Sequence, residues 1–178
     1  MPWMKASTAG FIAALIMFAL MYVGINVTGI APFTIPPSAA LFVKVLGLSV
    51  PTAKILGLLM HFTYGIFWSI VLLAIFWDRT SVGKGVGLSL GLWLLMMLVH
   101  SPIIGWGFFG FGADATGVLE LGSAPKYLLL TLVLHLIYGV VIGWVNSKWV
   151  VFGQDVAAQI RGAAEEDRLD FDDEADLA

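Results

Sequence analysis

Four long stretches of this sequence carry no charged side chain, and they constrain its fold more than any other feature. The first lies between Lys5 and Lys44, and the others span residues 55–77, 85–113 and 127–147. Each exceeds the roughly 20 residues that an α-helix needs to cross the hydrocarbon core of a bilayer. We therefore predict an all-α fold, a bundle of four transmembrane helices.

The composition agrees with a membrane protein, since 60% of the residues are hydrophobic and only 12% are charged. The first apolar stretch is longer than the roughly 7 to 15 residues of a signal-peptide core, so we expect a retained helix. The predicted helices cover about residues 6–30, 51–77, 84–106 and 125–149, within a transmembrane domain of residues 1–152.

The basic residues predict an orientation, because short loops rich in lysine and arginine stay in the cytoplasm. One side of the predicted bundle carries Lys5, Arg79, Lys84 and Lys148, and the other carries Lys44, Lys54 and Lys126. With two more arginines in the tail, this bias predicts a multi-pass protein of the cell (inner) membrane with both termini in the cytoplasm.

The C-terminal segment, residues 153–178, differs from the rest of the chain. Up to residue 154, seven basic and three acidic residues give a charge of +4, and beyond it two basic and nine acidic residues give −7. Such an acidic segment has little apolar surface to bury and repels itself, so we expect a disordered tail after a short helical start near Asp155. With a net charge of −3, the chain is not expected to bind nucleic acid.

Two predicted connections are longer than a turn. In the first, Pro36 and Pro37 precede an apolar segment from about Ser38 to Leu48, which is too short to span and suits an interfacial or re-entrant helix. The second contains "GWGFFGFG" at residues 105–112, whose aromatic side chains suit a belt at the membrane interface.

A repeat connects the second and fourth predicted helices, where "HFTYG" at His61 returns as "HLIYG" at His135. An offset of 74 also pairs Ser49 with Ser123, Pro51 with Pro125, Tyr64 with Tyr138 and Gly65 with Gly139. Serine two residues before proline is typical of a helix start, where the hydroxyl caps free backbone N–H groups. The repeat therefore suggests tandem duplication of a two-helix unit.

The repeat also predicts a site. Ten residues at ~1.5 Å each place His61 and His135 about 15 Å along their helices, and a similar count places His100 in the same layer of the bundle. Tyr64 and Tyr138 follow their histidines by three positions and so could hydrogen-bond the imidazoles. These five residues are the candidate site, and they would hold a haem or metal if one is bound.

Small residues at four-residue spacing predict where the helices approach closely. These residues are Ala6, Gly10 and Ala14 in the first helix, Gly83, Gly87 and Gly91 in the third, and Gly139 and Gly143 in the fourth.

The segments "HFTYG", "HSPIIGWGFFG" and "HLIYGVVIGW" together resemble a family of small four-helix inner-membrane proteins of unknown function. The resemblance covers the chain up to about Trp149, and it implies a fold and a location but no reaction.

Three functions fit these observations. The first is a non-enzymatic accessory or scaffolding subunit with a buried His/Tyr layer, contacting lipid and other membrane subunits or further copies of itself. The second is a b-type haem protein with His61 and His135 as axial ligands, or a three-histidine metal site as its variant. The third is a transporter or proton conductor that uses the intramembrane histidines. An enzyme is not predicted, because no Ser/His/Asp set or carboxylate pair falls in one layer.

Overall fold

The computed structural model describes residues 2–28, 31–112 and 124–175, and its elements are helical. Four helices form the main bundle: α1 (Pro2–Asn26), α3 (Val50–Phe76), α4 (Val82–Leu95) and α6 (Ala124–Ala175). Shorter elements are α2 (Pro37–Leu46), the 3₁₀ turns η1 (Trp77–Arg79) and η3 (Phe108–Gly110), the π-helical turn η2 (Met96–His100) and α5 (Ser101–Ile103). The all-α prediction is confirmed.

Four segments are long and apolar enough to cross a membrane: Pro2–Asn26, Val50–Arg79, Val82–Ile103 and Ala124–Trp149. They agree with the predicted spans to within a few residues at most ends, because hydropathy decides which segments a bilayer accepts. The chain is therefore compatible with a membrane-embedded protein in contact with lipid.

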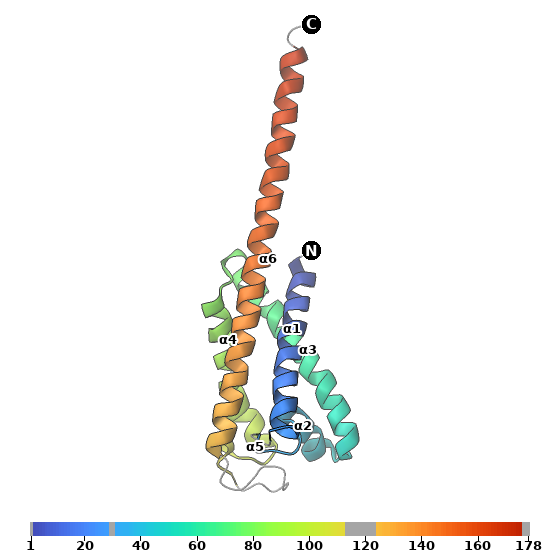
Figure 1. Ribbon diagram of the computed structural model, residues 1–178, viewed down its shortest axis with the longest axis vertical. Coiled ribbons are helices and arrows are strands. Elements are labelled where there is room, and N and C mark those ends of the chain that lie inside the picture. The colour runs from blue at the N-terminus through green and yellow to red at the C-terminus, as the bar shows by residue number, and fades with distance from the viewer. Residues whose placement is uncertain (1, 29–30, 113–123, 176–178) are drawn as a thin grey trace.

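Figure 1 shows how the four long helices are arranged side by side, with α2 and α5 gathered at one end of the bundle. We call this the α2 end. The N-terminus lies at the opposite end, where α6 leaves the bundle, and we call that the tail end. The helices α1 and α3 pack closely, as do α4 and α6, and α1 also packs on α6. By contrast, α3 and α4 barely touch.

Small residues allow the two closely packed pairs to form. A Cβ on Gly10 of α1 would lie 2.6 Å from the carbonyl oxygen of Gly65 on α3. Likewise, a Cβ on Gly85 of α4 would collide with the carbonyl oxygen of Gly139 on α6. The two pairs thus meet at matching positions of the repeat, with Gly65 and Gly139 in equivalent places.

The small-residue prediction is confirmed for α1 and α6 but is wrong for α4. Around Gly83, Gly87 and Gly91 an added Cβ would find open space, with nothing within 4 Å. Gly85 and the fully buried Ser89 face α6 instead. Glycines occur on two faces of α4, at neighbouring positions in the sequence. The position of α6 decides which of the two faces is packed.

A polar contact lies within the tail-end half of the bundle. The amide nitrogen of Asn146 on α6 donates to the Ser69 hydroxyl on α3 at 3.0 Å, and that hydroxyl donates to the carbonyl oxygen of Ala6 on α1 at 2.8 Å. Ser69 and Asn146 are both buried. This chain of bonds fixes three helices relative to one another where lipid offers no alternative partner.

The predicted serine cap takes a different form. Ser49 is the N-cap residue of α3, with Pro51 in the first turn, but its hydroxyl bonds the hydroxyl of Thr52 at 2.9 Å and caps no backbone N–H group. Its counterpart Ser123 lies outside the described residues.

The core at the α2 end contains an aromatic cluster. Trp106 is fully buried, with Phe33 stacked on it at 5.9 Å between ring centroids and Tyr127 edge-on at 5.2 Å. The interface-belt prediction is therefore wrong for Trp106, although Phe108 and Phe111 are exposed. Gly110 has φ of +79° and faces the Tyr127 ring, so a side chain there is strained and crowded. The glycines of this segment let the chain fold Trp106 inward, against Phe33 and Tyr127.

The tail is helical where disorder was predicted. Figure 1 shows α6 continuing well beyond the bundle, and the helix ends at Ala175. The packed part of α6 already supplies the helix nucleus, so each further residue adds a hydrogen bond without a nucleation cost. Alanine, glutamate and arginine recur in this segment, and they favour helix more than the charge repulsion had suggested.

Candidate functional site

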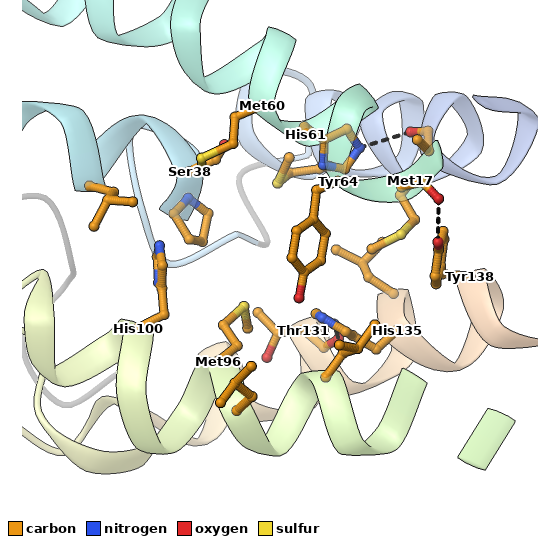
Figure 2. Close-up of a pocket in the computed structure, with 18 of the residues that line it drawn as sticks. Met17, Ser38, Met60, His61, Tyr64, Met96, His100, Thr131, His135 and Tyr138 are labelled. Atoms are coloured by element: carbon orange, nitrogen blue, oxygen red, sulfur yellow. Dashed lines mark hydrogen bonds between the residues drawn. The ribbon is translucent and has the colours of Figure 1, made fainter. Parts of the chain in front are cut away.

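A cavity of about 380 Å³ lies between the helices, near the α2 end. Figure 2 shows part of its walls, and the lining residues come chiefly from α1, α2, α3, α4, η2, α5 and α6. All five predicted site residues line it: His61 and Tyr64 from α3, His100 from η2, and His135 and Tyr138 from α6. The structure thus brings the candidate residues together around one space, although their proposed role as cofactor ligands stays a prediction.

The His61 ring is anchored to the backbone of α1. Its Nε2 lies 2.9 Å from the carbonyl oxygen of Ala14, which accepts the bond. A carbonyl cannot donate, so Nε2 must carry the proton and Nδ1 of the neutral ring carries a lone pair. The bond is drawn in Figure 2.

His135 is held differently, within its own helix. Its Nδ1 donates to the carbonyl oxygen of Thr131, one turn earlier in α6, at 2.7 Å. The lone pair of the neutral ring is therefore on Nε2. The two repeated histidines thus use opposite nitrogens for their backbone bonds.

His100 belongs to a local irregularity of the third transmembrane segment. It ends the π-helical turn Met96–His100, and Pro102 follows two residues later. Proline removes a backbone donor and crowds the preceding turn, which favours such a rearrangement. The Nδ1 atom of His100 is buried, and it has no hydrogen-bond partner among the residues that the structure describes.

The three histidines do not form the single layer that residue counting predicted. In Figure 2, His61 and His135 lie at one level on opposite sides of the cavity, whereas His100 lies nearer to α2. Because His61 and His135 stay level, the difference lies in the third segment, where His100 ends a π-helical turn that changes the rise per residue. Within the described residues, no cluster of three histidine or acidic side chains could hold a metal ion. The three-histidine metal variant is therefore not supported.

The tyrosines do not bond the histidines. Tyr138 is buried, and its hydroxyl donates to the carbonyl oxygen of Gly65 on α3 at 2.6 Å. Tyr64 is 43% exposed, and in Figure 2 its hydroxyl points across the cavity toward α4. In the part of the chain that the structure describes, no hydrogen bond joins an imidazole to a phenol. The predicted hydrogen bonds between histidines and tyrosines are therefore wrong. The Tyr138 hydroxyl bonds the Gly65 carbonyl instead, which is accessible because glycine has no side chain to shield it.

The exposed lining residues and the sparse contact between α3 and α4 indicate that the cavity opens sideways between these two helices. Its lining residues on α4, η2 and α5 include Leu95, Val99 and Ile103, each about half exposed on the outside of the bundle. Tyr64 forms the facing rim on α3. In a membrane this opening meets lipid rather than water.

The rest of the lining is apolar and adaptable. Met17, Met60 and Met96 contribute three flexible thioether side chains, which can adjust to guests of different shape. No pattern in the sequence separates methionines in a cavity wall from methionines on a packed helix face. Among the described residues that line the cavity, none is aspartate, glutamate, lysine or arginine.

Comparisons of this chain with protein-family models, with curated proteins and with solved structures found no match. The resemblance to four-helix inner-membrane proteins therefore stays a prediction, and function has to be inferred from the cavity and its chemistry.

Proposed function

We propose that this protein binds a lipid-soluble molecule, taken up from the surrounding membrane, in the histidine-lined cavity. The observation that carries the proposal is the position of the cavity: it lies inside the apolar bundle and opens between α3 and α4, the two neighbouring helices that barely touch. Ligand sites are typically apolar spaces of roughly 300 to 1,000 Å³ with a few polar groups. The cavity of about 380 Å³, with three imidazoles, fits that description.

The wider arrangement follows the sequence. The four apolar helices span the membrane, and the distribution of basic residues favours both termini in the cytoplasm. The ligand then enters from the half of the bilayer facing away from the cytoplasm. The short helix α2 lies near that surface, as an interfacial or re-entrant element beside the cavity.

The bundle arose by duplication of a two-helix unit in this proposal. Its support is the 74-residue offset and the matching close contacts of Gly65 with α1 and of Gly139 with α4. The duplicated halves enclose the cavity, and His61 and His135 stand at equivalent positions on its two sides.

The experiment compares lipids that copurify with the wild type and two matched variants in native membrane discs. Val99→Trp places an indole at the rim of the cavity, whereas Leu98→Trp places one on the neighbouring residue, which is similarly exposed but does not line the cavity. We expect an apolar species enriched over the bulk membrane in the wild type and in Leu98→Trp, and lost from Val99→Trp.

Mass spectrometry of the organic extract gives the answer. If the wild type holds no species above its abundance in the bulk membrane, the binding proposal is wrong. Equal enrichment in all three proteins would place the lipid on the outer surface and would also contradict it.

An accessory or scaffolding role is the second candidate, and the length of α6 favours it. The helix continues to Ala175 and leaves the bundle in Figure 1, so it presents a long helical arm on the tail side. Removal of residues 153–178 should then abolish any stable complex seen on native gels, while leaving the bundle folded. A complex that survives the truncation would contradict this role.

Haem binding stays a prediction, since His61 and His135 do face each other at one level. However, His61 Nε2 is already bonded to Ala14, so that ring would present Nδ1 to iron unless it turned. A dithionite-reduced visible spectrum tests it: a sharp band that disappears in His135→Leu would establish a cytochrome. Proton or solute flux in liposomes tests the transport alternative. Haem binding and transport both rank below ligand binding, because the observed hydrogen bonds of His61 and His135 require neither iron nor a proton pathway.

A further inference from the structure

We infer that the molecule bound in this cavity carries a hydroxyl head, that is, it is a lipid alcohol which donates a hydrogen bond to His61 or His135. The inference rests on the proposed ligand-binding function and adds the chemical class of the ligand. It follows from the backbone contacts of the two rings, which leave acceptors rather than donors facing the space between them.

The first step is the state of His61 and His135. A protonated imidazole without a counter-charge is costly in an apolar environment, and no described acidic side chain lines the cavity to supply that charge. Both rings are therefore neutral. Each then has one N–H and one lone pair.

The second step is which nitrogen holds the proton. The N–H of His61 is used on the carbonyl oxygen of Ala14, and the N–H of His135 on that of Thr131. Neither assignment can be reversed, because a carbonyl oxygen has no hydrogen to give. The remaining nitrogens, Nδ1 of His61 and Nε2 of His135, are hydrogen-bond acceptors.

The third step accounts for the hydroxyl groups nearby. The Thr131 hydroxyl donates to the carbonyl oxygen of Tyr127 at 2.7 Å and receives the indole N–H of Trp93 at 3.2 Å. The Tyr138 hydroxyl donates to Gly65. These two donors are therefore committed to protein partners. Among the described lining residues at the level of the paired histidines, the Tyr64 hydroxyl is then the remaining donor, and it can satisfy only one of the two imidazole acceptors, so a donor is still required.

Buried polar groups are nearly always satisfied, and in lipid there is little water to satisfy them. An alcohol meets the demand, since its O–H donates to an imidazole nitrogen while its oxygen accepts, for example from the Tyr64 hydroxyl that points across the cavity. A ketone, aldehyde, ether or ester can only accept. The cavity should therefore discriminate among lipids of equal chain by the presence of a free hydroxyl.

The test uses the full-length protein in phosphatidylcholine nanodiscs with a photoreactive long-chain alcohol as the probe. Farnesol, farnesal and farnesyl methyl ether then compete with the probe. The three share one isoprenoid chain and differ in the head, and only farnesol donates. Because a hydrogen bond within a membrane protein contributes ~0.6 to 2 kcal/mol, we expect farnesol to compete about 3- to 30-fold better than the other two.

The outcomes separate the two proposals. Preference for farnesol supports the inference. Equal competition by all three compounds overturns it while leaving a ligand cavity in place. If the probe crosslinks no cavity residue, or no competitor displaces it, the cavity does not bind such lipids, and the inference and the proposed function fail together.

A pair of variants locates the preference. His135→Phe removes the imidazole acceptor while keeping a ring. Farnesol and farnesyl methyl ether should therefore compete equally well with the probe for this variant. Val133→Phe adds a ring to an exposed position of α6 that does not line the cavity, and it should keep the wild-type preference. Full preference in His135→Phe and in the matching His61→Phe would overturn the inference.

Nitrogen-15 NMR supplies a readout that does not depend on variants. Farnesol should shift the signal of the bare nitrogen of His61 or His135 toward that of a hydrogen-bonded one, whereas farnesyl methyl ether should not. Signals from two protonated nitrogens on each ring in the unliganded protein would also overturn the inference.

Discussion

The hydroxyl of Tyr138 and the carbonyl oxygen of Gly65 lie 2.6 Å apart, and this bond joins α6 to α3 beside the cavity. Tyr64 is the counterpart of Tyr138 in the repeat, yet it is 43% exposed, whereas Tyr138 is 4% exposed. One tyrosine thus joins α6 to α3, and its counterpart stands at the opening between α3 and α4. The exposed Tyr64 thus marks the side on which we infer that the cavity opens.

Replacement of Tyr138 by phenylalanine should therefore destabilise the bundle, because the ring stays buried while the Gly65 carbonyl loses its donor. We expect a loss of about 0.6 to 2 kcal/mol in the free energy of unfolding, measured in mild detergent. Tyr64→Phe is the matched control and should cost less. Equal losses in the two variants would show that the Tyr138 bond has no special part in closing the bundle.

Gly10→Ala should weaken the packing of α1 on α3. Its Cβ would lie 2.6 Å from the Gly65 carbonyl oxygen and 2.7 Å from the Ile66 Cα, so the two backbones must separate. Overpacking of this kind costs about 1 to 3 kcal/mol.

Gly87→Ala is the comparison, since a Cβ there meets nothing within 4 Å and alanine favours helix. That variant should be neutral or slightly more stable in thermal unfolding. A destabilised Gly87→Ala would indicate that this face of α4 meets a partner, such as a second copy of the chain.

Ser69→Ala should remove the bond that connects three helices. The Asn146 amide nitrogen would then be left without its partner in a residue that is almost fully buried. The expected loss is about 1 to 3 kcal/mol. Ser147→Ala, whose hydroxyl bonds only its own helix at Trp144, should change stability little. Similar effects of both changes would contradict the role assigned to Ser69.

Truncation after Phe152 tests the helical tail. The removed residues continue α6 beyond the bundle, so the thermal midpoint of the bundle should not change. The mean-residue far-UV circular dichroism should also stay the same, because helix is removed together with residues. A rise in mean-residue helicity after truncation would mean that the tail is not helical.

The sequence predicted the apolar helices, and its five candidate residues do line one cavity, because both inferences depend on local signals. Uninterrupted apolar stretches identify membrane helices without knowledge of their neighbours. The repeat of His61 at His135 placed two imidazoles at one height, and the structure puts them on opposite sides of one cavity.

Features that depend on helix orientation could not be predicted in this way. Gly85 rather than Gly87 meets α6, and His100 lies nearer to α2 than residue counting suggested. Both outcomes depend on how α4 and the turn η2 that follows it are oriented in the bundle. The burial of Trp106 depends on a stacked partner, Phe33, that is distant in sequence. Local patterns contain no information about such distant partners.

Because the cavity opens sideways between α3 and α4, the affinity of a ligand is defined relative to the bilayer and not relative to water. A molecule that enters from the bilayer is already dissolved in oil, so leaving water contributes nothing to its binding there. Every phospholipid acyl chain nearby competes for the same space at the concentration of a solvent. Selectivity must then come from the few polar atoms of the cavity, and occupancy would follow the mole fraction of the ligand among the membrane lipids. Such a site would report on lipid composition.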